Sequence, residues 1–234
     1  MCARNCATPS LYGERHWTLS DEGSQQEDKM NEHPSVGLVL AGRPIPDALD
    51  HVRRYCGLPW SGGPPETWAY RYFDVVATDP EVLEPTDVVC AASLHPGISR
   101  DDLRFFHDQK AAIEMWLKTV GDDAVIRTAD AGTSLHRLLD FDAPSFTLLT
   151  KVLHRKRPHL VPVVDRHVID RYRPITGQRR PELAWPGLVH AFRSDLDLNL
   201  LALDEITGEI DAYLDVTPGP LRICDIAIWM EARR

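Results

Sequence analysis

The stretch of residues 145–177 sets the strongest constraint on what this chain can fold into. It reads SFTLLTKVLHRKRPHLVPVVDRHVIDRYRPITG. Its first apolar residues recur at three- and four-residue steps, which predicts an amphipathic helix. Pro158 stops that helix from continuing normally, and Pro162 keeps the apolar run after it extended. Asp165 then stands where its carboxylate would cap a second helix. The stretch predicts two helices joined by a short, buried, extended segment.

The remaining pattern predicts a mainly helical domain over residues 35–234, with residues 143–177 as its core motif and residues 1–34 as a disordered tail. The tail is polar and shows no period, whereas strands do not alternate with helices in the domain. Short extended pieces are expected at 35–42 and 69–78, with loops at 58–68 and 121–132. Further helices are expected at 46–56, 84–97, 99–120, 133–139, 181–196, 201–214 and 221–232. Ser99 would cap the helix at 99–120 with Asp102 as an imperfect capping box, and the helix at 221–232, apolar almost all round, is expected to be buried.

Charge is distributed unevenly along the chain. The formal net charge is −9, but residues 151–180 hold nine lysines and arginines against two aspartates, which gives +7 there and −16 elsewhere. Such a basic island is either an anion-binding surface or part of an internal network of salt bridges, and the second is the more common. The chain as a whole repels nucleic acid and anionic membranes, so any nucleic acid would have to bind at the island.

Several classes of protein are not expected. Five cysteines without a CxxC pair give no disulfide framework, and they favour a reducing cytoplasm. No apolar run approaches the ~20 residues of a membrane span, and no secretory signal opens the chain. His154, His159 and His167 lack a carboxylate at ligand spacing, so no metal is expected. No phosphate-binding loop or other cofactor motif is present, and the sequence leaves the oligomeric state open.

Three groups of residues are candidates for chemistry. Lys151 and Arg155 share one face of the first helix, where they would contact phosphates or simply form a solvated surface. Asp165 follows an apolar run beside several cations, so its carboxylate is either a reactive group or a plain helix cap, and the two roles are compatible. Asp225 lies in the apolar segment LRICDIAIW with Arg222 three residues before it, which indicates a local structural ion pair.

The motif SFTLLTKVLHRKRPHLVPVVDRHV resembles a bacterial domain family of unknown function, whose members carry a TKLL-x-RKRP-x-L-x-PV-x-D signature. The segments DVVCAASLHPGISRDDLRFF and LRICDIAIWM resemble other parts of the same family. Together these segments extend the resemblance over roughly residues 65–232. The resemblance implies no activity.

The segment VVDRHVIDR, residues 163–171, is similar to the part of helix-hairpin-helix DNA glycosylases in which a catalytic aspartate opens a helix. This resemblance implies a glycosylase-like fold, a DNA partner and Asp165 as the catalytic residue. It places Thr147 where bifunctional members have a lysine, so it implies hydrolysis without a lyase step. Residues 143–145, Ala-Pro-Ser, depart from the glycines of the family's hairpin.

The same resemblance implies that cations of the basic island would contact nucleic acid; these are Lys151, Arg155, Lys156, Arg157 and Arg166. The alternative is a non-catalytic helical module that keeps the fold and uses the island to bind nucleic acid or a protein.

Overall fold

The computed structural model describes residues 35–63, 69–94 and 97–233. The predicted disordered tail and part of the predicted loop at 58–68 lie outside the described residues. Within them the chain is mainly helical. The elements are β1 (Leu38–Leu40), β2 (Arg43–Ile45), α1 (Ala48–Cys56), α2 (Tyr70–Phe73), α3 (Pro85–Ala92), α4 (Arg100–Asp108), α5 (Lys110–Val120), α6 (Ala131–His136), the 3-10 helix η2 (Arg137–Phe141), α7 (Phe146–Lys156), α8 (Arg166–Thr176), α9 (Pro181–Leu198), α10 (Leu200–Asp211) and α11 (Pro220–Glu231).

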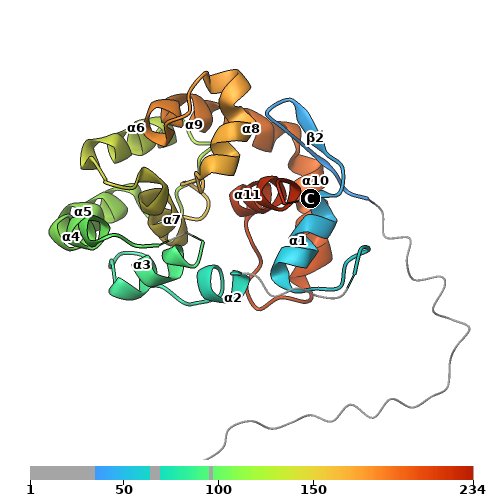
Figure 1. Ribbon diagram of the computed structural model, residues 1–234, viewed down its shortest axis with the longest axis horizontal. Coiled ribbons are helices and arrows are strands. Elements are labelled where there is room, and N and C mark those ends of the chain that lie inside the picture. Colours follow the sequence, from blue (N-terminus) through green and yellow to red (C-terminus); the bar gives the residue numbers. More distant parts are fainter. Residues whose placement is uncertain (1–34, 64–68, 95–96, 234) are drawn as a thin grey trace, which may run out of the picture. The chain divides into compact units, whose positions relative to one another are not determined.

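Helix α11 lies among the other helices and contacts α1, α8, α9 and α10 (Figure 1). Its side chains are buried almost all the way round, including Ile223, Cys224 and Ala227. A helix that is apolar on every face gains most by such burial, so the prediction of a buried C-terminal helix is confirmed. Charged groups on α11 must therefore find partners in the interior.

The core motif has the predicted form of helix, extended segment and helix. Ser145 caps α7, since its hydroxyl oxygen accepts a hydrogen bond from the Leu148 amide at 3.1 Å. The helix ends before Pro158, and the apolar run after it is buried. The Val164 amide donates to the hydroxyl oxygen of Thr150 at 3.2 Å, which fastens the extended segment to α7. This bond helps to fix where Asp165 enters α8.

Two predictions about local structure are wrong. The helix expected at 99–120 is divided into α4 and α5, because the backbone of Gln109 leaves the helical region with ψ of 3°. Residues 69–78 begin with α2 rather than an extended piece, since Tyr70 and Phe73 are buried on one face of a helical turn. The expected capping box of α4 is confirmed by reciprocal bonds between Ser99 and Asp102.

The strand expected near residues 35–42 is present as β1, but its partner β2 was not predicted. The two strands pair in antiparallel register, with Leu38 opposite Ile45. Ala41 and Gly42 form the turn with φ of 51° and 68°, which suits a tight hairpin. The Ala41 amide donates to Asp195 on α9 at 2.8 Å, so the hairpin is fixed to the helical core.

Among the helices of the described residues, none combines the length and apolar character that a membrane-spanning segment needs.

Candidate active site

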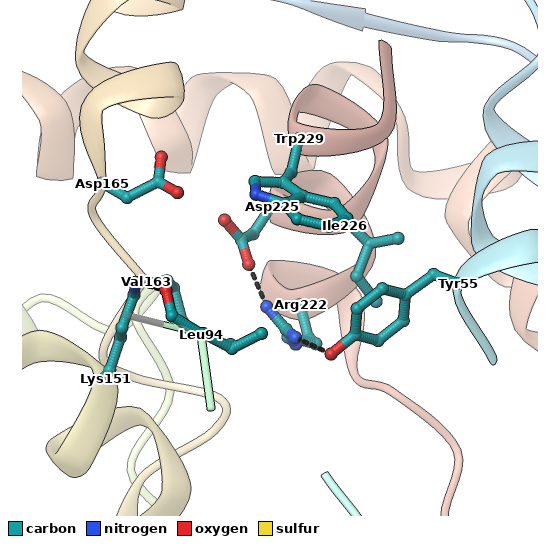
Figure 2. A pocket seen from close by; sticks show the side chains of 9 residues that line it. All are labelled: Tyr55, Leu94, Lys151, Val163, Asp165, Arg222, Asp225, Ile226 and Trp229. Carbon is teal, nitrogen blue, oxygen red and sulfur yellow. Dashed lines mark hydrogen bonds and ion pairs between the residues drawn. The ribbon is translucent and has the colours of Figure 1, made fainter. Parts of the chain in front are cut away.

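Asp165 occupies the N-cap position of α8, as predicted. One carboxylate oxygen, Oδ1, accepts hydrogen bonds from the amides of His167 at 2.8 Å and Val168 at 3.1 Å. The helix end therefore fixes the carboxylate in one orientation and stabilises its negative charge. Figure 2 shows that the carboxylate group points across a pocket toward α11 rather than out along α8.

The pocket is small and partly open to solvent, with free space of about 10 Å³, roughly enough for one water molecule. Its walls come from α1, α7 and α11, from Leu94 just after α3, and from the extended segment before α8. The residues that line it are Tyr55, Leu94, Lys151, Val163, Asp165, Arg222, Asp225, Ile226 and Trp229 (Figure 2). Elements far apart in the sequence thus bring an amine, a guanidinium group and two carboxyl groups together.

Lys151 reaches this pocket from α7 and is only 2% exposed. Its Nζ atom donates a hydrogen bond to the backbone carbonyl of Leu94. Burial lowers the pKa of the Lys151 amine, and the nearby carboxylates of Asp165 and Asp225 act in the opposite direction. The amine is therefore held in a desolvated position beside both acids.

Arg222 is the centre of a buried polar network on the other side of the pocket. Its guanidinium group bonds to Asp74 through Nε at 2.8 Å and Nη2 at 3.2 Å. It also pairs with Asp225 and donates to the hydroxyl oxygen of Tyr55. The Tyr55 hydroxyl in turn donates to Asp74 at 2.9 Å. The predicted pair of Arg222 and Asp225 is confirmed, but it belongs to a larger network that the sequence did not indicate.

Asp225 is buried beside this network and faces the pocket. Burial raises the pKa of its carboxyl group to about 7, and the negative charge of Asp165 adds to the effect. The cations of Arg222 and Lys151 oppose the rise. The pocket therefore holds two carboxyl groups in different settings, one bound to helix amides and one buried among charged side chains.

Sequence reasoning did not place Asp225, Lys151 and Asp165 in one pocket. The signal for Asp225 was a charged pair inside an otherwise apolar helix, which requires an interior partner. Thr147, at the position of the lysine in bifunctional glycosylases, does not line the pocket. Lys151, one helical turn later, supplies the amine instead.

Three of the predicted nucleic-acid contacts lie away from the pocket and are buried. Arg155 donates to the carbonyls of Phe73 and Val76, Lys156 pairs with Asp87, and Arg157 donates to the carbonyls of Pro80 and Leu117. Lys151 is buried too, and among the predicted contacts only Arg166 is exposed. The predicted phosphate contacts of Lys151, Arg155, Lys156 and Arg157 would require these side chains to leave the interior. They stay a prediction that this arrangement does not favour.

The fold and the pocket define a mainly helical protein with a small polar site built from carboxyl groups and an amine. The chain belongs to the family of unknown function DUF6308, whose family model matches residues 48–232. The expected membership of a family of unknown function is therefore confirmed, whereas the likeness to DNA glycosylases stays a prediction. No curated protein and no solved structure matches the chain.

Proposed function

We propose that the pocket around Asp165 hydrolyses an N-glycosidic bond in DNA, and that it does so without a lyase step. One observation carries this proposal: helix amides hold one oxygen of Asp165, while the carboxylate faces a pocket that also contains Lys151 and Asp225. Loss of a base from a sugar develops positive charge at the anomeric carbon. A fixed carboxylate stabilises that charge and accepts a proton from the attacking water.

The amine of Lys151 supports the same assignment. The amine lines the same pocket as the Asp165 carboxylate, and the two groups attract each other. Since the Lys151 amine is bonded to the Leu94 carbonyl, it acts here as a fixed charge, and water remains the nucleophile.

The small size of the pocket means that the substrate must be a nucleotide whose base has been flipped out of the base stack. The free space beside Asp165 is only about 10 Å³, roughly enough for one water molecule, so the lining side chains must move apart before an extruded base and its sugar reach Asp165. The indole of Trp229 provides an aromatic surface in the wall of the pocket (Figure 2). Arg166, which is exposed and adjacent to Asp165, is the cation placed to meet a phosphate of the same strand.

The test is a base-excision assay on duplex DNA carrying a panel of damaged bases, at low salt. Wild-type protein is expected to release a base and leave an abasic site, and Asp165→Asn is expected to bind the same DNA but lose excision. Asp170→Asn is the matched control, because Asp170 lies on the exposed face of the same helix. Release of no base by wild-type protein would overturn the proposal. A borohydride-trapped adduct on Lys151 would show that the Lys151 amine, and not water, is the nucleophile.

A second candidate is a non-catalytic module that binds nucleic acid or a protein. The burial of Lys151, Arg155, Lys156 and Arg157 favours a module with a protein partner, because any protein that binds duplex DNA needs cations on the surface that meets the phosphate backbone. A salt titration separates the two. Duplex binding with a steep salt dependence and no excision supports the module, whereas excision that depends on Asp165 supports the enzyme.

A further inference from the structure

We propose that Asp225 is the proton donor to the leaving base, so that the pocket works with two carboxyl groups in opposite roles. This inference rests on the proposed N-glycosidic hydrolysis and adds a second catalytic residue to it. Asp165 enters the pocket from the start of α8, and Asp225 enters from α11. The two groups thus flank a space of about 10 Å³, which the lining side chains must widen before a scissile bond could lie between them.

The geometry leaves one oxygen of Asp225 available. Oδ2 is bound to the Arg222 guanidinium group, and no other hydrogen bond of the carboxyl group occurs within the described residues. Figure 2 shows the second oxygen turned toward Asp165 and the pocket. Arg222 thereby orients the carboxyl group, and a proton on the free oxygen would point at the substrate.

The charges around the pocket favour a proton on Asp225. The groups that act on it are the carboxyl groups of Asp74 and Asp165 and the cations Lys151 and Arg222. Three carboxyl groups therefore share two cations, which leaves one acid without a compensating charge. Arg222 makes two hydrogen bonds with Asp74, and Asp74 also accepts a bond from Tyr55. Asp225 shares the Arg222 guanidinium group with Asp74 and is itself buried, so this arrangement favours the protonated form of Asp225.

The pKa of Asp225, raised to about 7 by burial, agrees with this charge count. A carboxylic acid that stays protonated near neutral pH can act as a general acid, and an ionised one in the same site can act as the base. Asp165, which two helix amides hold in a fixed orientation, is the carboxyl group of the pair that would act as the base.

The bond between the sugar carbon and the base nitrogen breaks, and its electron pair goes to the base, which takes the proton of Asp225. Water adds its oxygen to the sugar carbon and gives its proton to Asp165. The products are the free base and a sugar hydroxyl group. Return of the proton from Asp165 to Asp225 through solvent restores the starting state.

Two substrates separate this role from the role of Asp165. A neutral base needs a proton to leave, whereas 7-methylguanine already carries a positive charge and needs none. Asp225→Asn is expected to lose about a hundredfold or more of the rate on the neutral base and to keep most of the rate on 7-methylguanine. Asp165→Asn is expected to lose both. Asn at position 225 retains an oxygen for Arg222, and circular dichroism of each variant verifies the fold.

Equal losses on both bases in Asp225→Asn would overturn the proton-donor role while leaving the hydrolysis intact. Excision of 7-methylguanine alone by the wild type would also overturn it, because that base needs no donor. If the wild type releases no base at all, the proposed function fails and the donor role fails with it. A carbon-13 NMR titration measures the ionisation of the Asp225 carboxyl group directly and does not depend on enzymatic activity. Ionisation well below pH 7 in the folded protein would contradict the donor role.

Discussion

The Nζ atom of Lys156 lies 2.5 Å from Oδ2 of Asp87, and both side chains are buried. The same carboxylate accepts a bond from the Thr78 hydroxyl at 2.6 Å, and Lys156 also donates to the carbonyl of Asp79 at 2.8 Å. The ion pair therefore joins the end of α7 to α3 and to the loop before it. Part of the basic island is an internal anchor for residues 78–87 rather than a surface.

Replacement of Lys156 by Met is expected to destabilise the protein by about 3 kcal/mol, because it removes the nearer of the two cations that pair with the buried Asp87 within the described residues and leaves only Arg155, whose Nε lies 3.9 Å away. The free energy of unfolding, measured by urea titration, checks this value. Lys118→Met is the control, since Lys118 is an exposed lysine of α5. The double variant Lys156→Met with Asp87→Asn should recover part of the loss. A single variant as stable as wild type would mean that the pair contributes little.

The sequence predicted the parts of the fold that depend on local pattern. The α7–Asp165–α8 unit, the Ser99 capping box and the buried α11 all follow from spacing, caps and prolines close together in the chain. The division at Gln109 and the helical turn at Tyr70 depend on packing against distant segments. No local signal specifies those contacts, so the prediction failed there.

The candidate site was only partly predictable for the same reason. Asp165 could be chosen from its position after an apolar run, and the contact of Arg222 with Asp225 from helical spacing. Whether the cations of the basic island are exposed or buried could not be predicted from the sequence. A lysine at the surface and one that bonds to an interior carbonyl, as Lys151 does with Leu94, look alike in a linear pattern. The distinction depends on long-range contacts that only the folded chain supplies.

His154 is expected to make the protein less stable in acid. Burial lowers its pKa to about 4, and the Arg222 cation adds to the effect. A lowered histidine pKa gives stability that is present above the unfolded value of 6.5 and is lost as pH falls toward 4. The contribution is at most roughly 3 kcal/mol.

Urea titrations of wild type and His154→Gln between about pH 7 and pH 4 test this dependence. The variant is less stable at neutral pH, because it loses the bond from the ring to the Val161 carbonyl, but the difference should shrink in acid. His107→Gln, a change at an exposed histidine of α4, should follow the wild-type curve. A constant difference between His154→Gln and wild type would contradict the prediction.

The cap and the proposed chemistry of Asp165 can be separated by two substitutions. Asn caps a helix about as well as Asp, so Asp165→Asn should change the free energy of unfolding by less than about 0.5 kcal/mol. Asp165→Ala removes the acceptor for the His167 and Val168 amides and should cost ~1 kcal/mol. Thermal unfolding of both variants checks the order. Equal stability of the two would show that the cap contributes little, and the Asn variant would then lose its value as a stable but inactive form.

Asp225 is expected to act on stability in the direction opposite to His154. Its folded pKa is raised from 3.8 to about 7, so the folded state binds a proton that the unfolded state has released. The stability from this group is complete below pH 3.8 and is lost as pH rises through about 7, by at most roughly 4 kcal/mol.

In wild type this fall partly cancels the rise from His154, so the difference in the free energy of unfolding between variant and wild type is the useful quantity. Asp225→Asn cannot ionise, so it should gain stability relative to wild type as pH rises from about 4 to about 7. The exposed control Asp170→Asn should show no such gain, and a gain of the same size in both variants would assign the effect to net charge instead of burial.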